Sequence, residues 1–168
     1  MIPEMPHAGD MAPDFTAMCT DGEFTLSERV KDGPVLLYFY VVNYGRTCTD
    51  YLATMNERFK DFRSRGITLY QVNHDSIENH RDWMRHTASK YEIVSDPGEE
   101  ISRSYGCIVV RAKSDKILGN PNRGFFLIGK DMRVLYAWQA YWPTETVPMD
   151  ELFERMDEAV GRDVNGVN

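Results

Sequence analysis

A continuous apolar run of eight residues occupies positions 35–42. Such a run without polar alternation is typical of a strand that is buried on both faces of a sheet. Residues 14–18 and 23–26 flank Asp21-Gly22, a dipeptide favoured in tight turns, and therefore predict a β-hairpin near the amino terminus. Further strands are predicted at residues 67–72, 91–95, 124–128 and 133–139, and residues 107–110 are expected to be extended.

Apolar residues between these strands recur at helical spacing. One such stretch covers residues 48–65 and is predicted to end at Gly66, a residue type that favours helix ends. A second helix is expected to start near Asp75, which with Glu78 resembles a capping box. A short helix is expected over residues 99–105.

The last helical pattern follows Pro148. Its apolar side consists of Met149, Leu152, Phe153, Met156 and Val160. Gly161 is predicted to end this helix, and residues 162–168 are predicted to form a frayed tail.

The order of these elements predicts the fold class. Strands alternate with helices early in the chain, and a strand hairpin followed by a helix closes it, which favours a mixed central sheet flanked by helices. The sequence therefore predicts an α/β protein with a thioredoxin-like fold and an N-terminal β-hairpin extension. The length suits one domain and no internal repeat is present, so we expect residues 1–168 to form a single domain.

The composition of the chain disfavours some classes of binding partner. The chain has a formal net charge of −7, which makes nucleic acid or an anionic membrane surface an unfavourable partner. No apolar run approaches the roughly 20 residues that span a bilayer. The first ten residues lack a basic segment followed by an apolar one, so we expect a cytoplasmic protein.

Three cysteines, Cys19, Cys48 and Cys107, are too far apart for a Cys-x-x-Cys motif or for a metal site. Their odd number in a chain without a recognisable leader indicates a reducing compartment, in which each thiol is either buried or reactive. Three histidines follow one another at intervals of six residues, which places them on different faces of a helix. We therefore expect neither a metal nor an organic cofactor.

Cys48 is the strongest candidate for chemistry. It is expected in the first turn of a helix, just beyond the carboxyl end of the buried strand 35–42, where ligands bind in open α/β sheets. Unpaired backbone N–H groups and the helix dipole favour a thiolate at this point. Arg46 adds to this effect and Asp50 opposes it.

The segment VLLYFYVVNYGRTCTDY resembles the active-site segment of the peroxiredoxin family (alkyl hydroperoxide reductase and thiol-specific antioxidant), and similarity extends over residues 12–160. Arg123 in NRGFFLIG matches the arginine that the family places beside its reactive cysteine. The resemblance implies a thiolate at Cys48 that attacks a hydroperoxide and becomes a sulfenic acid. It also implies an external thiol as reductant and a homodimer. Substrate contacts are expected from Val41, Tyr44, Gly45, Arg46 and Thr47.

Two motif positions differ from the family pattern Pro-x-x-x-Thr-x-x-Cys, because Val41 replaces the proline and Gly45 replaces the threonine. The threonine hydroxyl bonds the bound peroxide in the family, and glycine offers no such group. Tyr51 also stands where many relatives carry an acidic residue. The alternative function is therefore a degenerate peroxiredoxin-like module that senses redox state or binds a partner. A dithiol oxidoreductase is disfavoured because no second cysteine lies near Cys48.

Cys107 has two interpretations. It follows Gly106 and opens an apolar segment, which favours a core position. It is also the candidate resolving cysteine, which would form a disulfide with oxidised Cys48. Cys19 is a weaker candidate for the same role.

Overall fold

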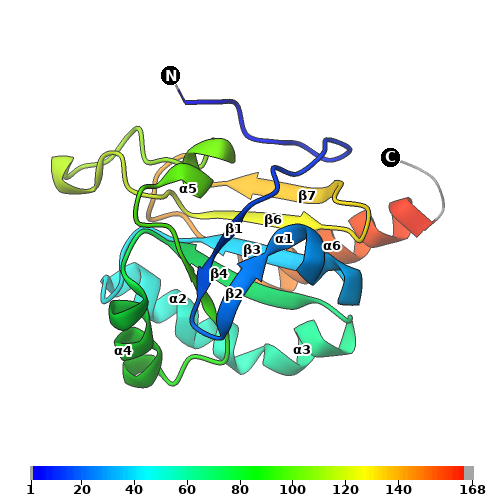
Figure 1. Ribbon diagram of the computed structural model, residues 1–168, viewed down its shortest axis with the longest axis horizontal. Helices are drawn as coiled ribbons and strands as arrows, with labels where there is room; N and C mark the ends of the chain where they lie inside the picture. The colour runs from blue at the N-terminus through cyan, green and yellow to red at the C-terminus, as the bar shows by residue number, and fades with distance from the viewer. Residues whose placement is uncertain (1, 165–168) are drawn as a thin grey trace.

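The computed structural model describes residues 2–164, and a seven-stranded sheet lies at its centre (Figure 1). The spatial order of the strands is β2-β1-β5-β4-β3-β6-β7. Their bounds are β1 Thr16–Cys19, β2 Gly22–Thr25, β3 Val35–Phe39, β4 Thr68–Asn73, β5 Ile93–Ser95, β6 Gly124–Ile128 and β7 Val134–Gln139. The predicted N-terminal hairpin and the predicted mixed sheet are both confirmed.

Strand directions explain the mixed character of the sheet. β3, β4 and β5 are parallel to one another, whereas β6 pairs antiparallel with β3, and β7 pairs antiparallel with β6. The β1–β2 hairpin joins the opposite edge through an antiparallel contact with β5. β3 is therefore a central strand, and all of its residues are buried, as its apolar run predicts.

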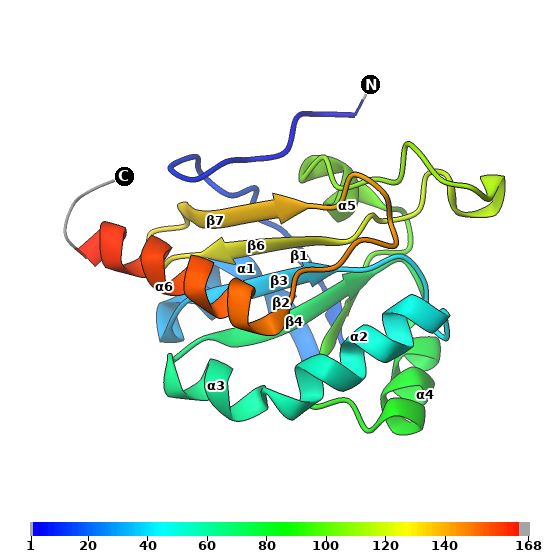
Figure 2. The ribbon, with the colours of Figure 1, turned by 180° about the vertical axis from the view of Figure 1, so that it is seen from behind.

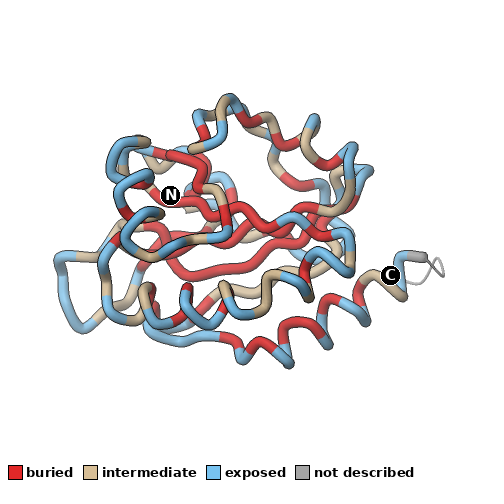
Figure 3. The backbone as a smooth tube through the Cα atoms, turned by 90° about the horizontal axis from the view of Figure 1, so that it is seen from below, coloured by how far each residue is buried: buried red, intermediate tan, exposed pale blue. Residues whose placement is uncertain are grey.

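Two core clusters fill the two faces of the sheet. Figure 2 shows the helices that cover the sheet, and Figure 3 shows that the strands at its centre are mainly buried. Alternate residues of β3 show the division, since Leu36 and Tyr38 belong to one cluster and Leu37 and Phe39 to the other. The first cluster packs beneath α2, α3, α4 and α6, and the second beneath α1 and α5. The helices are α1 Leu26–Arg29, α2 Arg46–Glu57, α3 Phe59–Ser64, α4 Ile77–Thr87, α5 Glu100–Ser104 and α6 Met149–Val164, with short 3₁₀ turns at Val30–Asp32 and Asp115–Ile117.

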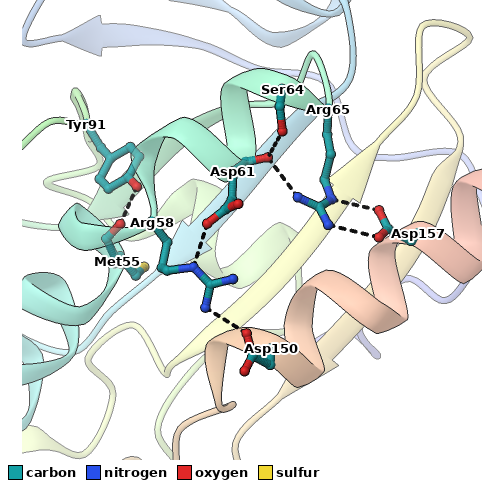
Figure 4. Close-up of polar contacts among 8 residues, drawn as sticks. All are labelled: Met55, Arg58, Asp61, Ser64, Arg65, Tyr91, Asp150 and Asp157. Carbon is teal, nitrogen blue, oxygen red and sulfur yellow. Dashed lines mark hydrogen bonds and ion pairs between the residues drawn. The ribbon is translucent and has the colours of Figure 1, made fainter.

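The single helix predicted over residues 48–65 is wrong in one respect, because Arg58 interrupts it and divides it into α2 and α3. Tertiary contacts accompany the break (Figure 4). The Tyr91 hydroxyl donates to the Met55 carbonyl at 2.5 Å, which takes up an acceptor at the end of α2. Arg58 bonds Asp61 at 2.6 Å and reaches Asp150 at the start of α6 at 2.8 Å. These contacts tie the α2–α3 junction to α6.

Helix ends also depart from the predictions. Ser76, not Asp75, caps α4, and its side chain accepts from the Asn79 N–H. α6 continues through Gly161 as far as Val164, so the helix does not stop there. The predicted frayed tail is therefore helical at its start, and its remainder lies outside the described residues. No helix of residues 2–164 has the length and apolar character to cross a membrane.

Candidate active site

Cys48 lies in the first turn of α2, immediately after the loop that follows β3. Gly45 is the N-cap residue of α2 and supplies no side-chain acceptor for the N–H groups of the first turn. These N–H groups and the positive end of the helix dipole lie at the helix end that carries the sulfur, and both favour a thiolate. The residue retains 6% of its accessible surface, so it is buried without being fully enclosed.

Sheet topology brings Arg123 to this cysteine. Arg123 directly precedes β6, and β6 pairs antiparallel with β3 so that Gly124 lies opposite Phe39. The start of β6 is therefore beside the end of β3, where the chain turns into α2. The Arg123 Nη2 group donates to the Cys48 Sγ at 3.5 Å, although 75 positions separate the two residues.

The guanidinium of Arg123 is held by neutral groups. Its Nη1 donates to the Tyr38 hydroxyl at 2.5 Å, and its Nε donates to the Pro143 carbonyl at 3.2 Å. The ring of Tyr51 lies 5.8 Å from the guanidinium carbon, within range of a cation–π contact. Among the side chains that the structure describes, no carboxylate pairs with Arg123.

Arg123 is a buried positive charge without a carboxylate partner among the described residues, and its Nη2 group is directed at the Cys48 sulfur. Arg123 is 1% exposed, and a buried charge without a counter-ion is costly. Burial opposes the charged guanidinium, but attraction to and hydrogen bonds with Tyr38 and Cys48 outweigh it, so the pKa of Arg123 is raised. Burial also raises the pKa of Tyr38, with Arg123 acting in the opposite direction. The guanidinium thus stays charged and the phenol stays neutral, so the charge of Arg123 is available to the sulfur beside it.

Comparison with known proteins identifies the family. The sequence model of the AhpC/TSA family matches residues 8–137, a span that contains both Cys48 and Arg123. The chain belongs to this peroxiredoxin family.

Individual relatives agree with the family match. Peroxiredoxin 2 of Picrophilus torridus is 32% identical over 146 residues, which cover 83% of this chain and 68% of that relative. The 1-Cys peroxiredoxin B of Oryza sativa subsp. japonica is 28% identical over 133 residues, 75% of this chain and 60% of that relative. The chain thus spans about two thirds of the length of the curated relatives it matches. The solved structure of a yeast mitochondrial 1-Cys peroxiredoxin superimposes with a TM-score of 0.83 at 18% sequence identity. The superposition covers 96% of this chain and 80% of the yeast chain, and the two share the same fold.

The two substituted motif positions of this peroxiredoxin are occupied differently. Val41 is buried, and its carbonyl accepts from the Asn120 amide at 3.2 Å. A Cβ atom added at Gly45 would lie 2.8 Å from the Val42 Cγ1 atom, so Val42 fills the space that a larger residue would need. The Thr49 hydroxyl donates to the Gly45 carbonyl at 2.6 Å and is already engaged.

The other residues predicted to contact substrate differ in how their side chains are engaged. The Tyr44 hydroxyl donates to Asp82 on α4, and the Tyr44 ring packs edge-on against Trp83 at 4.9 Å. Arg46 is exposed. Thr47 is half-buried, and its hydroxyl takes part in no hydrogen bond among the described residues. Thr47 therefore has the one free hydroxyl in the predicted contact set, and that of Tyr44 is used on α4.

The structure does not bring Cys107 to Cys48. The two residues belong to core clusters on opposite faces of the sheet. Cys107 Sγ donates to the Asn122 carbonyl at 3.3 Å, and a Cβ atom at Gly124 would come within 2.7 Å of it. Burial raises the pKa of the Cys107 thiol, and it raises that of Cys19 to about 12. Both thiols are fully buried, and burial favours their protonated form.

Sequence reasoning missed Tyr38 and the Pro143 carbonyl, which hold Arg123 in place. A signal for Tyr38 was present, because alternate residues of a strand share a face and Tyr38 and Tyr40 fall on the face that Cys48 covers. No pattern in the sequence pointed to Pro143. Among the described residues, no group of three or more His, Cys, Asp or Glu residues is arranged to hold a metal ion.

Proposed function

We propose that the protein is a thiol peroxidase that reduces hydrogen peroxide or small organic hydroperoxides through Cys48. The observation that carries this proposal is the 3.5 Å contact between the Cys48 sulfur and the buried Arg123 guanidinium, which has no carboxylate partner among the described residues. Family membership supports the same reaction type.

The reaction begins with the Cys48 thiolate. Its sulfur attacks one peroxide oxygen, so that an S–O bond forms as the O–O bond breaks, and Cys48 becomes a sulfenic acid. The departing oxygen takes up a proton and leaves as water or an alcohol. Arg123 and the free N–H groups of the first turn of α2 stabilise the negative charge that develops on the peroxide oxygens.

A thiol from outside the chain then completes the cycle. It attacks the sulfenic acid, forms a mixed disulfide with Cys48 and releases water, and a second thiol frees Cys48 as the external disulfide forms. The burial of Cys107 on the face of the sheet opposite Cys48 supports an external reductant. We extend the proposal to a homodimer in the cytoplasm, as the family resemblance and the composition suggest.

The alternative is a redox-sensing or binding module without efficient peroxidase activity. Gly45 favours it, because this position lacks the hydroxyl that contacts the peroxide in the family, and Val42 occupies the adjoining space. A lost hydrogen bond of this kind costs about 2–4 kcal/mol in the transition state, or roughly 10²–10³ in rate.

One experiment decides between the two. Reduced protein is mixed with one equivalent of hydrogen peroxide, and peroxide loss and sulfenic acid trapping are followed in the wild type, in Cys48→Ser and in Cys107→Ala as the matched control. Rapid loss that disappears only in Cys48→Ser supports the peroxidase. A wild-type rate equal to that of free cysteine would leave the module as the function.

A further inference from the structure

A group of buried polar side chains lies beneath the loop between β3 and α2. Tyr40, Asn43, Asn73 and His80 are each at most 5% exposed, and none of them contacts Cys48 or Arg123 through a hydrogen bond. Burying polar groups is costly unless they are paired. These residues are paired with one another, so the arrangement is a built network and not an accident of packing.

Asn43 uses all of its hydrogen-bonding groups. Its Oδ1 accepts from the Tyr40 hydroxyl at 2.5 Å. Its Nδ2 donates to Asn79 Oδ1 at 2.8 Å and to His80 Nδ1 at 3.1 Å. Asn79 and His80 are both on α4, so the Asn43 side chain joins the loop to that helix.

His80 takes part in this network as a single tautomer. Its Nε2 lies 3.2 Å from the Asn73 carbonyl, which can only accept, so this nitrogen carries the proton. Its Nδ1 is then the acceptor for Asn43, as neutral imidazole requires. Burial lowers the pKa of His80 to about 4, against smaller opposing contributions from the Asn73 carbonyl and from Asp75, while His74 acts in the same direction as burial.

The neighbouring residue strengthens the attachment of the loop. Tyr44 adopts a φ of 65°, a left-handed conformation that is uncommon for a residue other than glycine. Its side chain contacts Asp82 and Trp83, again on α4. Two consecutive loop residues are therefore attached to α4, and the next residue, Gly45, is the N-cap of the helix that carries Cys48.

We propose that Asn43 and His80 are positioning residues, which hold the β3–α2 loop on α4 and thereby set the Cys48 sulfur against Arg123. The contact that they maintain is the 3.5 Å hydrogen bond from the guanidinium to the sulfur. Displacing a reacting group by about 1 Å can reduce a rate about a hundredfold, even when the altered residue is remote from the chemistry. The proposal rests on the proposed function for the peroxide step, but not for the placement of the sulfur.

The test compares three variants at positions 80 and 81 of α4. His80→Leu removes both hydrogen bonds, His80→Gln restores one donor and one acceptor, and Arg81→Gln changes an exposed residue on the same helix as the matched control. Two rates are measured in each folded variant: alkylation of Cys48 by iodoacetamide, located by mass spectrometry, and consumption of hydrogen peroxide. Circular dichroism and thermal unfolding establish that the fold is retained.

We expect His80→Leu to slow both reactions by about tenfold to a hundredfold. His80→Gln should recover most of the loss, and Arg81→Gln should match the wild type. Asn43→Leu should slow both reactions as well, and the double variant Asn43→Leu/His80→Leu should be slower by less than the product of the two single effects, because both changes remove the shared Asn43–His80 contact.

A folded His80→Leu protein whose Cys48 is alkylated at the wild-type rate would overturn the proposal, even if its unfolding temperature were lower. If His80→Leu does not fold, the comparison passes to Asn43→Leu, which removes the same contact from the loop side, and a wild-type alkylation rate in folded Asn43→Leu would overturn the proposal. A wild type that is inactive with peroxide refutes the proposed function alone, since the alkylation rates still report the position of the sulfur.

Discussion

Replacing Arg123 by methionine separates the chemical contribution of this arginine from its structural one. A unit positive charge 3.5 Å from an anionic sulfur interacts with it by roughly 5 kcal/mol at an effective dielectric constant of about 20. The N–H groups at the start of α2 remain in the variant and retain part of this stabilisation. We therefore expect Arg123→Met to reduce the rate of peroxide consumption by about 10²–10³.

The same change should alter folding stability little. Methionine removes a buried charge that has no carboxylate partner among the described residues, which favours the folded variant. It also leaves the Tyr38 hydroxyl and the Pro143 carbonyl without their donor, which opposes it. Because the two effects act in opposite directions, we expect the free energy of unfolding to change by less than about 2 kcal/mol.

Stopped-flow measurement of peroxide consumption and urea unfolding test these two expectations together. Arg81→Met is the matched control, since Arg81 is an exposed arginine of α4 with no hydrogen bond to Cys48 or Arg123 among the described residues, and solvent screens its charge. The reasoning is refuted if Arg123→Met stays as active as Arg81→Met. It is also refuted if the activity disappears because the variant is largely unfolded, since Arg123 would then be a structural residue.

Three further predictions concern other parts of the molecule. Gly45→Thr should lower the free energy of unfolding by about 1–3 kcal/mol through the clash with Val42. The double variant Gly45→Thr/Val42→Ala should relieve this clash and consume peroxide faster than Gly45→Thr alone. Equal urea midpoints for the single and the double variant would contradict this. One equivalent of hydrogen peroxide should leave Cys48 and Cys107 unbridged in non-reducing mass analysis. The depressed pKa of His80, about 4 against 6.5, means that neutral His80 stabilises the fold fully above pH 6.5. About 3 kcal/mol of this stability is lost as the pH falls to 4, and His80→Gln should flatten that part of the pH–stability curve.

The strands and the reactive helix could be predicted because their signals are local. The apolar run at 35–42 fixes β3 as a strand buried on both faces, and the residues after it place Cys48 at a helix start. The break at Arg58 could not be predicted in this way. It is accompanied by contacts from Tyr91 and Asp150, residues that lie far along the chain, and helical spacing carries no information about them.

The contact between Arg123 and Cys48 also depends on residues that are far apart in the sequence. No spacing rule relates two residues 75 positions apart, and only the family resemblance predicted that they meet. The antiparallel pairing of β6 with β3 supplies the physical reason, because it places the start of one strand at the end of the other. The network of Asn43 and His80 was missed for a similar reason, since each residue alone reads as an ordinary polar residue of a loop or a helix.

Tyr51 shows why the substitutions near Cys48 must be considered together. Its hydroxyl donates to the Val147 carbonyl at 2.6 Å, and its ring lies 5.8 Å from the Arg123 guanidinium carbon. An acidic side chain at this position would neutralise the guanidinium and compete with the sulfur for it. A tyrosine leaves the positive charge for the sulfur and the bound peroxide. In the proposed reaction the absence of a hydroxyl at Gly45 removes a contact to the peroxide, whereas an uncharged residue at position 51 leaves the Arg123 charge available to the sulfur. The departures at Gly45 and Tyr51 therefore act in opposite directions on the same step.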